Sequence, residues 1–290
     1  MRFDRQRLTV IGLSTLPFLI GGGLAWLILT SEVFGEIVSA STQYYSLFDI
    51  AIQTLISVGL GTLVVLSLFY TIQKSGPAAR RTLVALVVSP ILTVSFFVVG
   101  QSLIFILFKG ADAIASLLAF VTLGVLLMSF VFIMMDSIPG YLRNFFVAFY
   151  GSVFGTFLGV ISLTASMIVL VVSVVLEDYF LTRYSPTTEA ITLVDTPGAD
   201  PFDYTRIQTH TAAVGVGDYI AFSLISAHSL LFFPLYVWVM SVLLAGLGIL
   251  INITIIAREN EILPGIPLPA LLALFPWIVH LIAFSVLGMG

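Results

Sequence analysis

The chain lacks cysteine entirely and carries very little charge. The absence of thiols excludes disulfides, cysteine nucleophiles and cysteine-ligated zinc. Only 9% of the residues are charged, whereas about a quarter are charged in ordinary soluble domains. The net charge of -4 provides no basic surface for nucleic acid. We therefore expect a protein embedded in the lipid bilayer, with no nucleic-acid partner.

Motifs of several enzyme classes are missing as well. The sequence contains no His-Glu-x-x-His for an intramembrane zinc protease and no Gly-x-Ser-Gly with a partner histidine for a serine protease. It contains no phosphate-binding loop either. His228 and His280 stand alone on apolar segments, where a hydrogen-bonded packing role is expected. We therefore expect neither a bound metal nor a cofactor.

Long hydrophobic runs are what the chain has in abundance. Hydrophobic residues make up 59% of it, and a run of about 20 residues is enough to cross a bilayer. Single spans of this kind lie near 8–30, 48–73, 82–108 and 111–135. The first is longer than a signal-peptide core and lacks a small-residue cleavage site, so we expect a retained helix.

Two further runs are too long for one span each. The run 143–182 would be about 60 Å long as a helix, twice the hydrocarbon thickness, and should break near Ile161–Thr164. The run 212–257 should break at Phe233-Pro234, because proline cannot continue a helix. With a last span at 268–288, the sequence predicts an all-α polytopic membrane protein of nine transmembrane helices.

The basic residues predict the orientation of this bundle. With the N-terminus in the cytoplasm, nine spans leave only Lys109 outside among the eleven lysines and arginines. This bias agrees with the positive-inside rule, and one helix more or fewer would reverse every later loop. We therefore expect the C-terminus outside and a multi-pass location in the cell membrane of a prokaryote. The ten residues on the inner side are Arg2, Arg5, Arg7, Lys74, Arg80, Arg81, Arg143, Arg183, Arg206 and Arg258.

Two aspartates lie where a bilayer disfavours charge. Asp178 ends the sixth expected span, and Asp218 closes Gly215-Val216-Gly217-Asp218 at the start of the seventh. A charge within hydrocarbon costs several kcal/mol, which makes such residues candidates for function. If the seventh helix begins near Ala212, both acids lie roughly 8 to 9 Å inside the cytoplasmic boundary.

Two carboxyl groups at one depth on neighbouring antiparallel helices can share a proton, as aspartic-protease chemistry requires. Gly215 and Gly217 would let another backbone approach closely beside Asp218. The alternative is that each acid reaches the membrane interface or bonds a nearby serine or threonine. The pair is therefore predicted from spacing, with its contact open.

Three motifs occur in a definite order along the expected helices. Gly215-Val216-Gly217-Asp218 opens the seventh helix, Asp178 ends the sixth, and Pro269-Ala270-Leu271 opens the ninth. This arrangement resembles the presenilin and signal peptide peptidase family of intramembrane aspartyl proteases, by architecture over the whole chain. The resemblance implies that Asp178 and Asp218 are catalytic, and that the two glycines and the Pro-Ala-Leu tripeptide support them.

The resemblance also implies a substrate class, namely transmembrane proteins, typically single-span helices, cut within the membrane. Glu177 stands where the family usually has tyrosine, and the 183–211 loop is short, without an autocleavage insert. The chain is thus similar to compact microbial, archaeal-type homologues of presenilin, and we expect no obligate partner subunit. Its expected parts are six helices in 1–182, the cytoplasmic loop 183–211, and three helices in 212–290.

The cytoplasmic loop is predicted to contain a β-hairpin. Ala190–Val194 and Tyr204–Thr209 are strand-like, and Pro197–Pro201 between them is rich in turn residues. A helical substrate must unwind and find new partners for its freed backbone. We expect it to add as a strand along Ile207, Gln208 and Thr209, as the resemblance also suggests. The alternative is a linker that is disordered without substrate.

The tripeptide Pro269-Ala270-Leu271 has two interpretations. Proline is tolerated in a first helical turn, so the motif can be a helix start and nothing more. The resemblance implies instead that Pro267 and Pro269 hold the backbone extended before Leu271. Unpaired backbone carbonyl groups would then face the substrate or line one side of the aspartate pair.

Two other functions are open at this point. Prepilin and preflagellin peptidases also use Gly-x-Gly-Asp, but commonly with lysine where this chain has Ile220, and they lack the Pro-Ala-Leu helix. A cation- or proton-coupled transporter or channel can also carry paired intramembrane carboxylates, although no inverted repeat is evident here. Cleavage of a single-span substrate would separate the protease and transporter classes.

Overall fold

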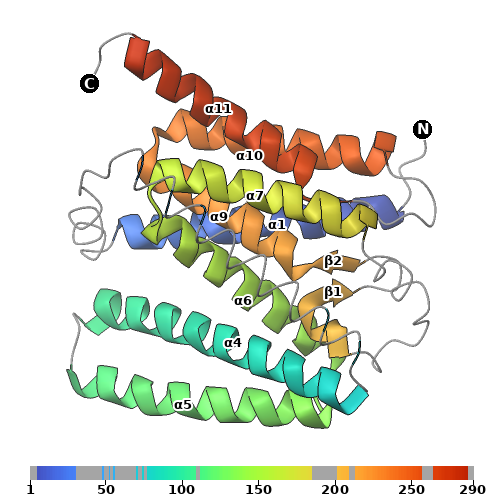
Figure 1. Cartoon of the computed structure of the whole chain (residues 1–290). Coiled ribbons are helices and arrows are strands. Elements are labelled where there is room, and N and C mark those ends of the chain that lie inside the picture. The colour runs from blue at the N-terminus through green and yellow to red at the C-terminus, as the bar shows by residue number, and fades with distance from the viewer. Residues whose placement is uncertain are drawn as a thin grey trace.

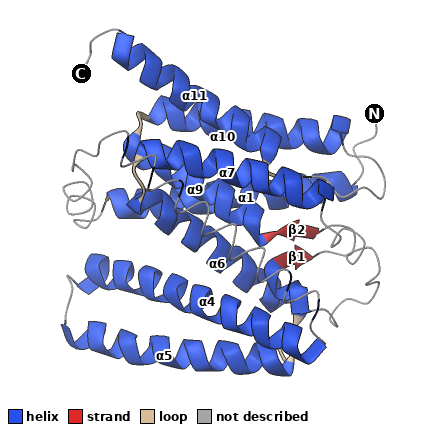
Figure 2. Ribbon diagram, viewed as in Figure 1, coloured by secondary structure: helices blue, strands red, loops and turns tan. Residues whose placement is uncertain are grey.

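The computed structural model describes most of the chain. The described residues are 5–30, 77–108, 112–184, 201–208, 213–256 and 264–286, with the single helical residues Phe48, Ile52, Leu55, Tyr70 and Lys74. The second expected span, 48–73, otherwise lies outside them. Within these ranges the chain is helical apart from short connections and one two-stranded sheet (Figure 2).

Eight α-helices are formed by the described residues (Figure 1). They are α1 (Arg5–Leu29), α4 (Pro77–Phe108), α5 (Asp112–Met135), α6 (Gly140–Ile161), α7 (Thr164–Tyr184), α9 (Val216–Phe232), α10 (Leu235–Ile251) and α11 (Pro267–Val286). A π-helical segment, Asn252–Ile256, continues α10. In Figure 1, α4 and α5 form one side of the bundle and α10 and α11 the other, with α1, α6, α7 and α9 between them.

Five of the described helices are long and apolar enough to cross a membrane. The spans are Arg7–Leu29, Ala79–Phe108, Ser116–Met135, Gly140–Ile161 and Leu235–Ile256. Two shorter apolar helices, Val216–Phe232 and Pro267–Ala283, accompany them. The architecture is therefore that of an all-α membrane protein, while the count of nine spans and the orientation stay predictions.

Both expected breaks in the long apolar runs are confirmed. Helix α6 ends at Ile161 and α7 begins at Thr164, and α9 ends at Phe232 before α10 begins at Leu235. Pro234 is the residue that caps α10. Its fixed φ and missing N–H break α9 but suit the position before a first helical turn.

Helix α9 is the buried centre of the bundle, packed most extensively against α6 and α1. Glycines allow the close approach. A β-carbon at Gly155 would lie 2.2 Å from the Ile220 carbonyl oxygen, and one at Gly21 would lie 2.6 Å from that of Ser223. Any side chain at these positions would push the helices apart. The start of α9, which carries Asp218, is thus held firmly within the bundle.

A small sheet precedes α9, and it differs from the expected hairpin. Strand β1 (Arg206–Gln208) pairs antiparallel with β2 (Ala213–Gly215), Ile207 lying opposite Val214. The predicted strand Tyr204–Thr209 is confirmed for Arg206–Gln208 only, because its first two residues belong to a 3₁₀ turn, η1 (Pro201–Thr205). The other predicted strand, Ala190–Val194, lies outside the described residues, as do Thr209 and 197–200.

The helix carrying Asp218 begins later than predicted. The expectation of a start near Ala212 is wrong, because Ala213–Gly215 is extended and α9 begins at Val216. Pairing with β1 overrides the helix propensity of this apolar segment, as tertiary context commonly does for short β segments. Asp218 is consequently the third residue of its helix and lies in the first turn.

Candidate functional site

Asp178 lies near the C-terminal end of α7 and is held by the entry to α11. Its Oδ2 accepts a hydrogen bond of 3.1 Å from the backbone N–H of Ile266. The Thr182 hydroxyl, one turn further along α7, lies 3.5 Å from Oδ1. A carboxylate that accepts a backbone N–H is fixed in orientation, because the amide cannot rotate away.

Asp218 lies in the first turn of α9, where a negative charge interacts favourably with the helix dipole. Its carboxylate accepts a hydrogen bond from the backbone of Gly215, the residue that caps the helix. Gly265 packs directly on the same carboxylate: a β-carbon there would lie 2.8 Å from Oδ1 and 3.0 Å from Oδ2. The loop before α11 therefore touches both aspartates.

The two carboxyl groups converge on one dipeptide. Gly265 packs on Asp218, and the next residue, Ile266, donates its N–H to Asp178. The carboxylates also interact electrostatically with each other. Residues on three separate elements, α7, α9 and the entry to α11, thus form one cluster at one end of the bundle. The sequence left open whether the two acids meet; in the structure they share the Gly265-Ile266 dipeptide as a common neighbour, although α9 begins later than predicted.

No basic side chain among those that the structure describes forms an ion pair with either aspartate. Two neighbouring carboxyl groups without a counter-ion are most stable when they share one proton, because two adjacent negative charges repel. Such a pair can accept a proton at one oxygen and donate one from the other. The arrangement suits acid–base chemistry or the carriage of a proton or cation.

The glycines before Asp218 behave differently from the prediction. We expected another backbone to approach closely beside them, and that expectation is wrong for the described residues. The nearest atom to a β-carbon at Gly215 would be 3.9 Å away, and at Gly217 it would be 4.0 Å away. Both glycines are exposed. Among the described residues, the close approach occurs at Gly265 instead.

The Pro-Ala-Leu tripeptide is helical. Helix α11 begins at Pro267, and the Ala270 N–H donates to the Ile266 carbonyl at 2.9 Å. The prediction of extended backbone before Leu271 is therefore wrong, because both prolines fit a first turn in which amides lack helical partners. The tripeptide supports the cluster through the residues just before it, Gly265 and Ile266.

Pro269 and Ala270 pack inward, whereas Leu271 does not. A β-carbon at Gly248 of α10 would lie 2.6 Å from the Cα of Pro269, so α10 and α11 are in close contact there. Ala270 is fully buried, and Leu271 is 49% exposed. The first two residues of the tripeptide thus hold α11 against α10, while the third presents an apolar side chain at the surface.

Sequence reasoning missed the dipeptide that joins the two aspartates. Its signal in the sequence is a glycine between two prolines, in Pro264-Gly265-Ile266-Pro267, directly before the Pro-Ala-Leu tripeptide. Asn252, in the π-helical segment, lies 3.5 Å from the carbonyl oxygens of Pro264 and Gly265. Such π segments occur frequently at functional sites.

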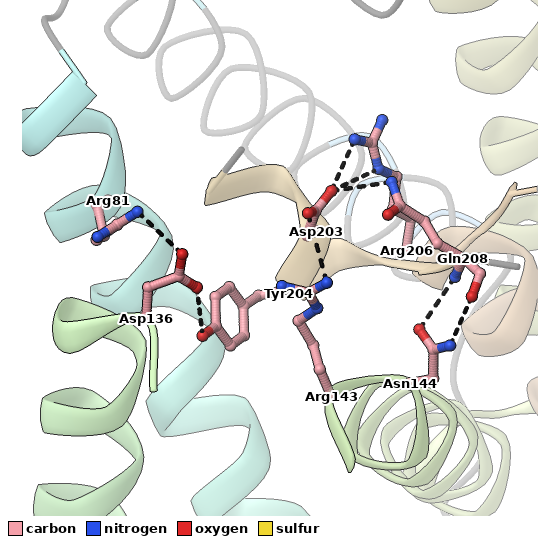
Figure 3. A network of polar contacts seen from close by, with 8 residues as sticks. All are labelled: Arg81, Asp136, Arg143, Asn144, Asp203, Tyr204, Arg206 and Gln208. Atoms are coloured by element: carbon pink, nitrogen blue, oxygen red, sulfur yellow. Dashed lines mark hydrogen bonds and ion pairs between the residues drawn. The ribbon is translucent and has the colours of Figure 1, made fainter. Parts of the chain in front are cut away.

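A second polar cluster, also missed, surrounds β1 and η1 (Figure 3). Asp203 is 1% exposed, and its Oδ1 accepts hydrogen bonds from Arg206 at 2.8 Å and from Gln208 Nε2 at 2.9 Å. Arg143 of α6 lies 3.5 Å from its Oδ2. Asp203 is therefore a buried carboxylate with two cationic partners.

Tyr204 connects this cluster to α4 and to the turn after α5. Its hydroxyl donates to Asp136 at 3.1 Å, and Asp136 pairs with Arg81 of α4 at 3.3 Å (Figure 3). Tyr150 of α6 donates to the Tyr204 carbonyl at 2.7 Å. Burial, and then the neighbouring Asp136 carboxylate, raise the pKa of Tyr204 to about 12. The segment that leads into β1 is thus anchored to α4, α6 and the turn after α5.

The packing role expected for the histidines is confirmed. His228, fully buried in α9, contacts the Gly159 carbonyl at 2.7 Å and the Thr164 hydroxyl at 3.1 Å. His280 of α11 hydrogen-bonds the Tyr236 hydroxyl at 2.6 Å. Both therefore join neighbouring helices away from the aspartates.

The helices and the site together define a multi-pass helical membrane protein with a pair of adjoining carboxyl groups at one end of its bundle. Within the described ranges, no three His, Cys, Asp or Glu side chains gather in a way that could hold a metal ion. No protein-family model, curated protein or solved structure matches the chain. Its function must be argued from the site itself.

Proposed function

We propose that this protein is an intramembrane aspartyl endopeptidase that hydrolyses peptide bonds within transmembrane segments. The observation that carries the proposal is the convergence of Asp178 and Asp218 on the Gly265-Ile266 dipeptide. The order of the aspartates and the Pro-Ala-Leu tripeptide, which resembles presenilin and signal peptide peptidase, supports it.

The proposed reaction uses the two carboxyl groups in complementary states. The ionised one takes a proton from a water molecule, whose oxygen attacks the scissile carbonyl carbon. The protonated one donates to the carbonyl oxygen, and collapse of the tetrahedral intermediate breaks the C–N bond as the nitrogen is protonated. The pair acts as one unit, so the roles belong to the pair rather than to either residue.

We propose that the substrate docks on β2 rather than on β1. A residue in an antiparallel strand points its N–H and C=O to the same side. Those of Gln208 are bonded to the Asn144 side chain, at 3.0 and 2.6 Å, so the outer edge of β1 is already occupied there. This argues against the sequence-based expectation that Ile207 and Gln208 receive the substrate strand.

The edge of β2 fits that role better. Gln208 lies opposite Ala213, and Ala213 and Gly215 are exposed while Val214 between them is buried. Because Gln208 points its backbone away from β2, Ala213 opposite it also points its N–H and C=O away from β1. A strand added there would run beside Gly215 and reach Asp218, which follows only three residues later.

The test is a reconstituted assay that separates the candidate classes. Purified protein in vesicles is given a labelled single-span substrate, and fragments are identified by mass spectrometry while proton and sodium flux are recorded. The proposal predicts two fragments cut inside the apolar segment and no coupled flux. Flux without fragments would favour a transporter, and cleavage only at the membrane boundary would favour a prepilin-type peptidase.

A further inference from the structure

Asn144 of α6 holds β1 in the way that a neighbouring strand would. Its Nδ2 donates to the Gln208 carbonyl at 2.6 Å, and its Oδ1 accepts from the Gln208 N–H at 3.0 Å (Figure 3). A carboxamide offers one donor and one acceptor side by side, which matches the N–H and C=O of one strand residue. The side chain thus ends the sheet on this side.

Gln208 is fixed a second time through its own side chain. Its Nε2 donates to Asp203 at 2.9 Å, and that buried carboxylate is bound in turn by Arg206 and Arg143. Two of the three residues of β1 therefore share one buried acceptor. The strand cannot slide along α6 without breaking both sets of contacts.

The position of β1 determines the position of β2. Gln208 lies opposite Ala213, and Arg206 lies opposite Gly215. The contacts that hold β1 on α6 therefore also restrain Gly215, the residue that caps α9. A slip of one residue would move a strand by about 3.3 Å and exchange its two faces. Without the anchor on β1, the β2 edge and a substrate strand paired with it would lose their fixed alignment with Asp218.

We propose that Asn144 is a positioning residue that fixes the register of the β1–β2 pair and thereby selects which peptide bond of the substrate reaches the aspartates. The inference rests on the proposed proteolytic function, because the choice of bond can be measured only in a protein that cleaves its substrate. It assigns the choice of cleavage site to α6, an element that does not contribute to the aspartate pair.

The experiment compares Asn144→Ala with Tyr141→Ala, an exposed position on the same helix, in the full chain reconstituted in nanodiscs. Mass spectrometry identifies the bonds cut in a single-span substrate, and amide hydrogen exchange reports on 206–208 and 213–215. For Asn144→Ala we expect cleavage to spread to bonds one or two residues away. The rate of amide exchange in both strands should rise about ten-fold, because the net contribution of about one hydrogen bond to their stability is lost. Tyr141→Ala should match the wild type in both.

Asn144→Asp provides a second variant that keeps the acceptor for the Gln208 N–H and loses the donor. Its cleavage pattern and exchange should fall between those of the wild type and the alanine variant. The same bonds cut in the same proportions, or unchanged exchange in both strands, would overturn the inference while leaving the protease proposal intact. A wild-type protein that cuts no substrate would overturn both, whatever the exchange data.

Discussion

Carboxylates occur in two contrasting settings within this bundle. Asp203 is 1% exposed and bonded to Arg206, Arg143 and Gln208. Asp178 and Asp218 have backbone groups, a threonine and each other as their partners among the described residues. The first carboxylate lies between two arginines, and the other two lie together with no cationic partner in the part of the chain that the structure describes.

The contrast separates structural from reactive chemistry. A buried carboxylate between arginines has its oxygens occupied by charged hydrogen-bond donors, so it holds the segments around it together. Two carboxyl groups without a counter-ion gain by binding one proton between them, which leaves a proton acceptor beside a proton donor. We therefore expect substitutions at Asp203 to act on stability and those at Asp178 or Asp218 to act on chemistry.

The largest expected effect is on binding of a transition-state analogue. A peptide with a hydroxyethylene group in place of the scissile bond should bind the wild type, because its hydroxyl takes the place of the attacking water. Asp178→Asn or Asp218→Asn should weaken binding about 100-fold or more, in line with the contribution of a positioned acid or base. The double variant should lose little more than either single one, since the pair acts as a unit. Calorimetry or fluorescence titration measures these affinities, and additive losses would argue against a shared role.

The next effect is on stability at Asp203. Asp203→Ala leaves the buried Arg143 and the partly buried Arg206 without their carboxylate, and breaking a buried pair in this way costs about 3 to 5 kcal/mol. The melting temperature should fall well below that of Asp203→Asn, which keeps an oxygen acceptor for Arg206. Equal melting temperatures for the alanine variant and the wild type would show that the cluster does not stabilise the fold.

A smaller effect is expected at Gly265, with a matched glycine as control. Gly265→Ala would place a methyl group 2.8 Å from Asp218 Oδ1, so the carboxylate must move aside. Because a side-chain end gives way easily, stability should change little, whereas a displaced catalytic group should slow cleavage about 10- to 100-fold. Gly246→Ala, with no atom within 4 Å of the new methyl group, should leave both unchanged. Initial cleavage rates and melting curves measure these effects. A wild-type rate for Gly265→Ala would show that the loop before α11 does not position Asp218 for catalysis.

The smallest effect concerns Tyr204 and alkaline pH. Tyr204→Phe removes the hydrogen bond to Asp136 and should lower stability by about 1 kcal/mol at neutral pH. The folded pKa of about 12 exceeds the ordinary value of 10.0, so this contribution is complete below pH 10 and is lost as pH rises toward 12. The difference in melting temperature between the two proteins should therefore narrow across that interval. A constant difference would mean that Tyr204 does not ionise as expected.

The sequence predicted the helical breaks well because their causes are local. Pro234 cannot continue α9, and the run that ends at Ile161 is too long for a single span. It also identified both aspartates, since a charge in an apolar run is visible without any tertiary information.

Features that depend on contacts between distant elements were not predictable in the same way. The strand at Ala213–Gly215 forms only because β1 lies beside it, whereas its apolar sequence alone predicts helix. Asn144 and Gln208 lie 64 residues apart, and no local pattern links them. The same holds for Gly265 and Asp218, whose contact became apparent only from the packing of α9 against the entry to α11.

The most direct test of the central claim is cleavage by purified protein in nanodiscs, measured side by side for the wild type, Asp178→Asn, Asp218→Asn and Asp203→Asn. We expect two fragments of a single-span substrate from the wild type and a rate about 100- to 10,000-fold lower from each of the first two variants. Those two variants should melt at the wild-type temperature. Asp203→Asn should instead keep measurable cleavage and melt lower. Substantial cleavage by either Asp178→Asn or Asp218→Asn would show that the two carboxyl groups are not the catalytic pair.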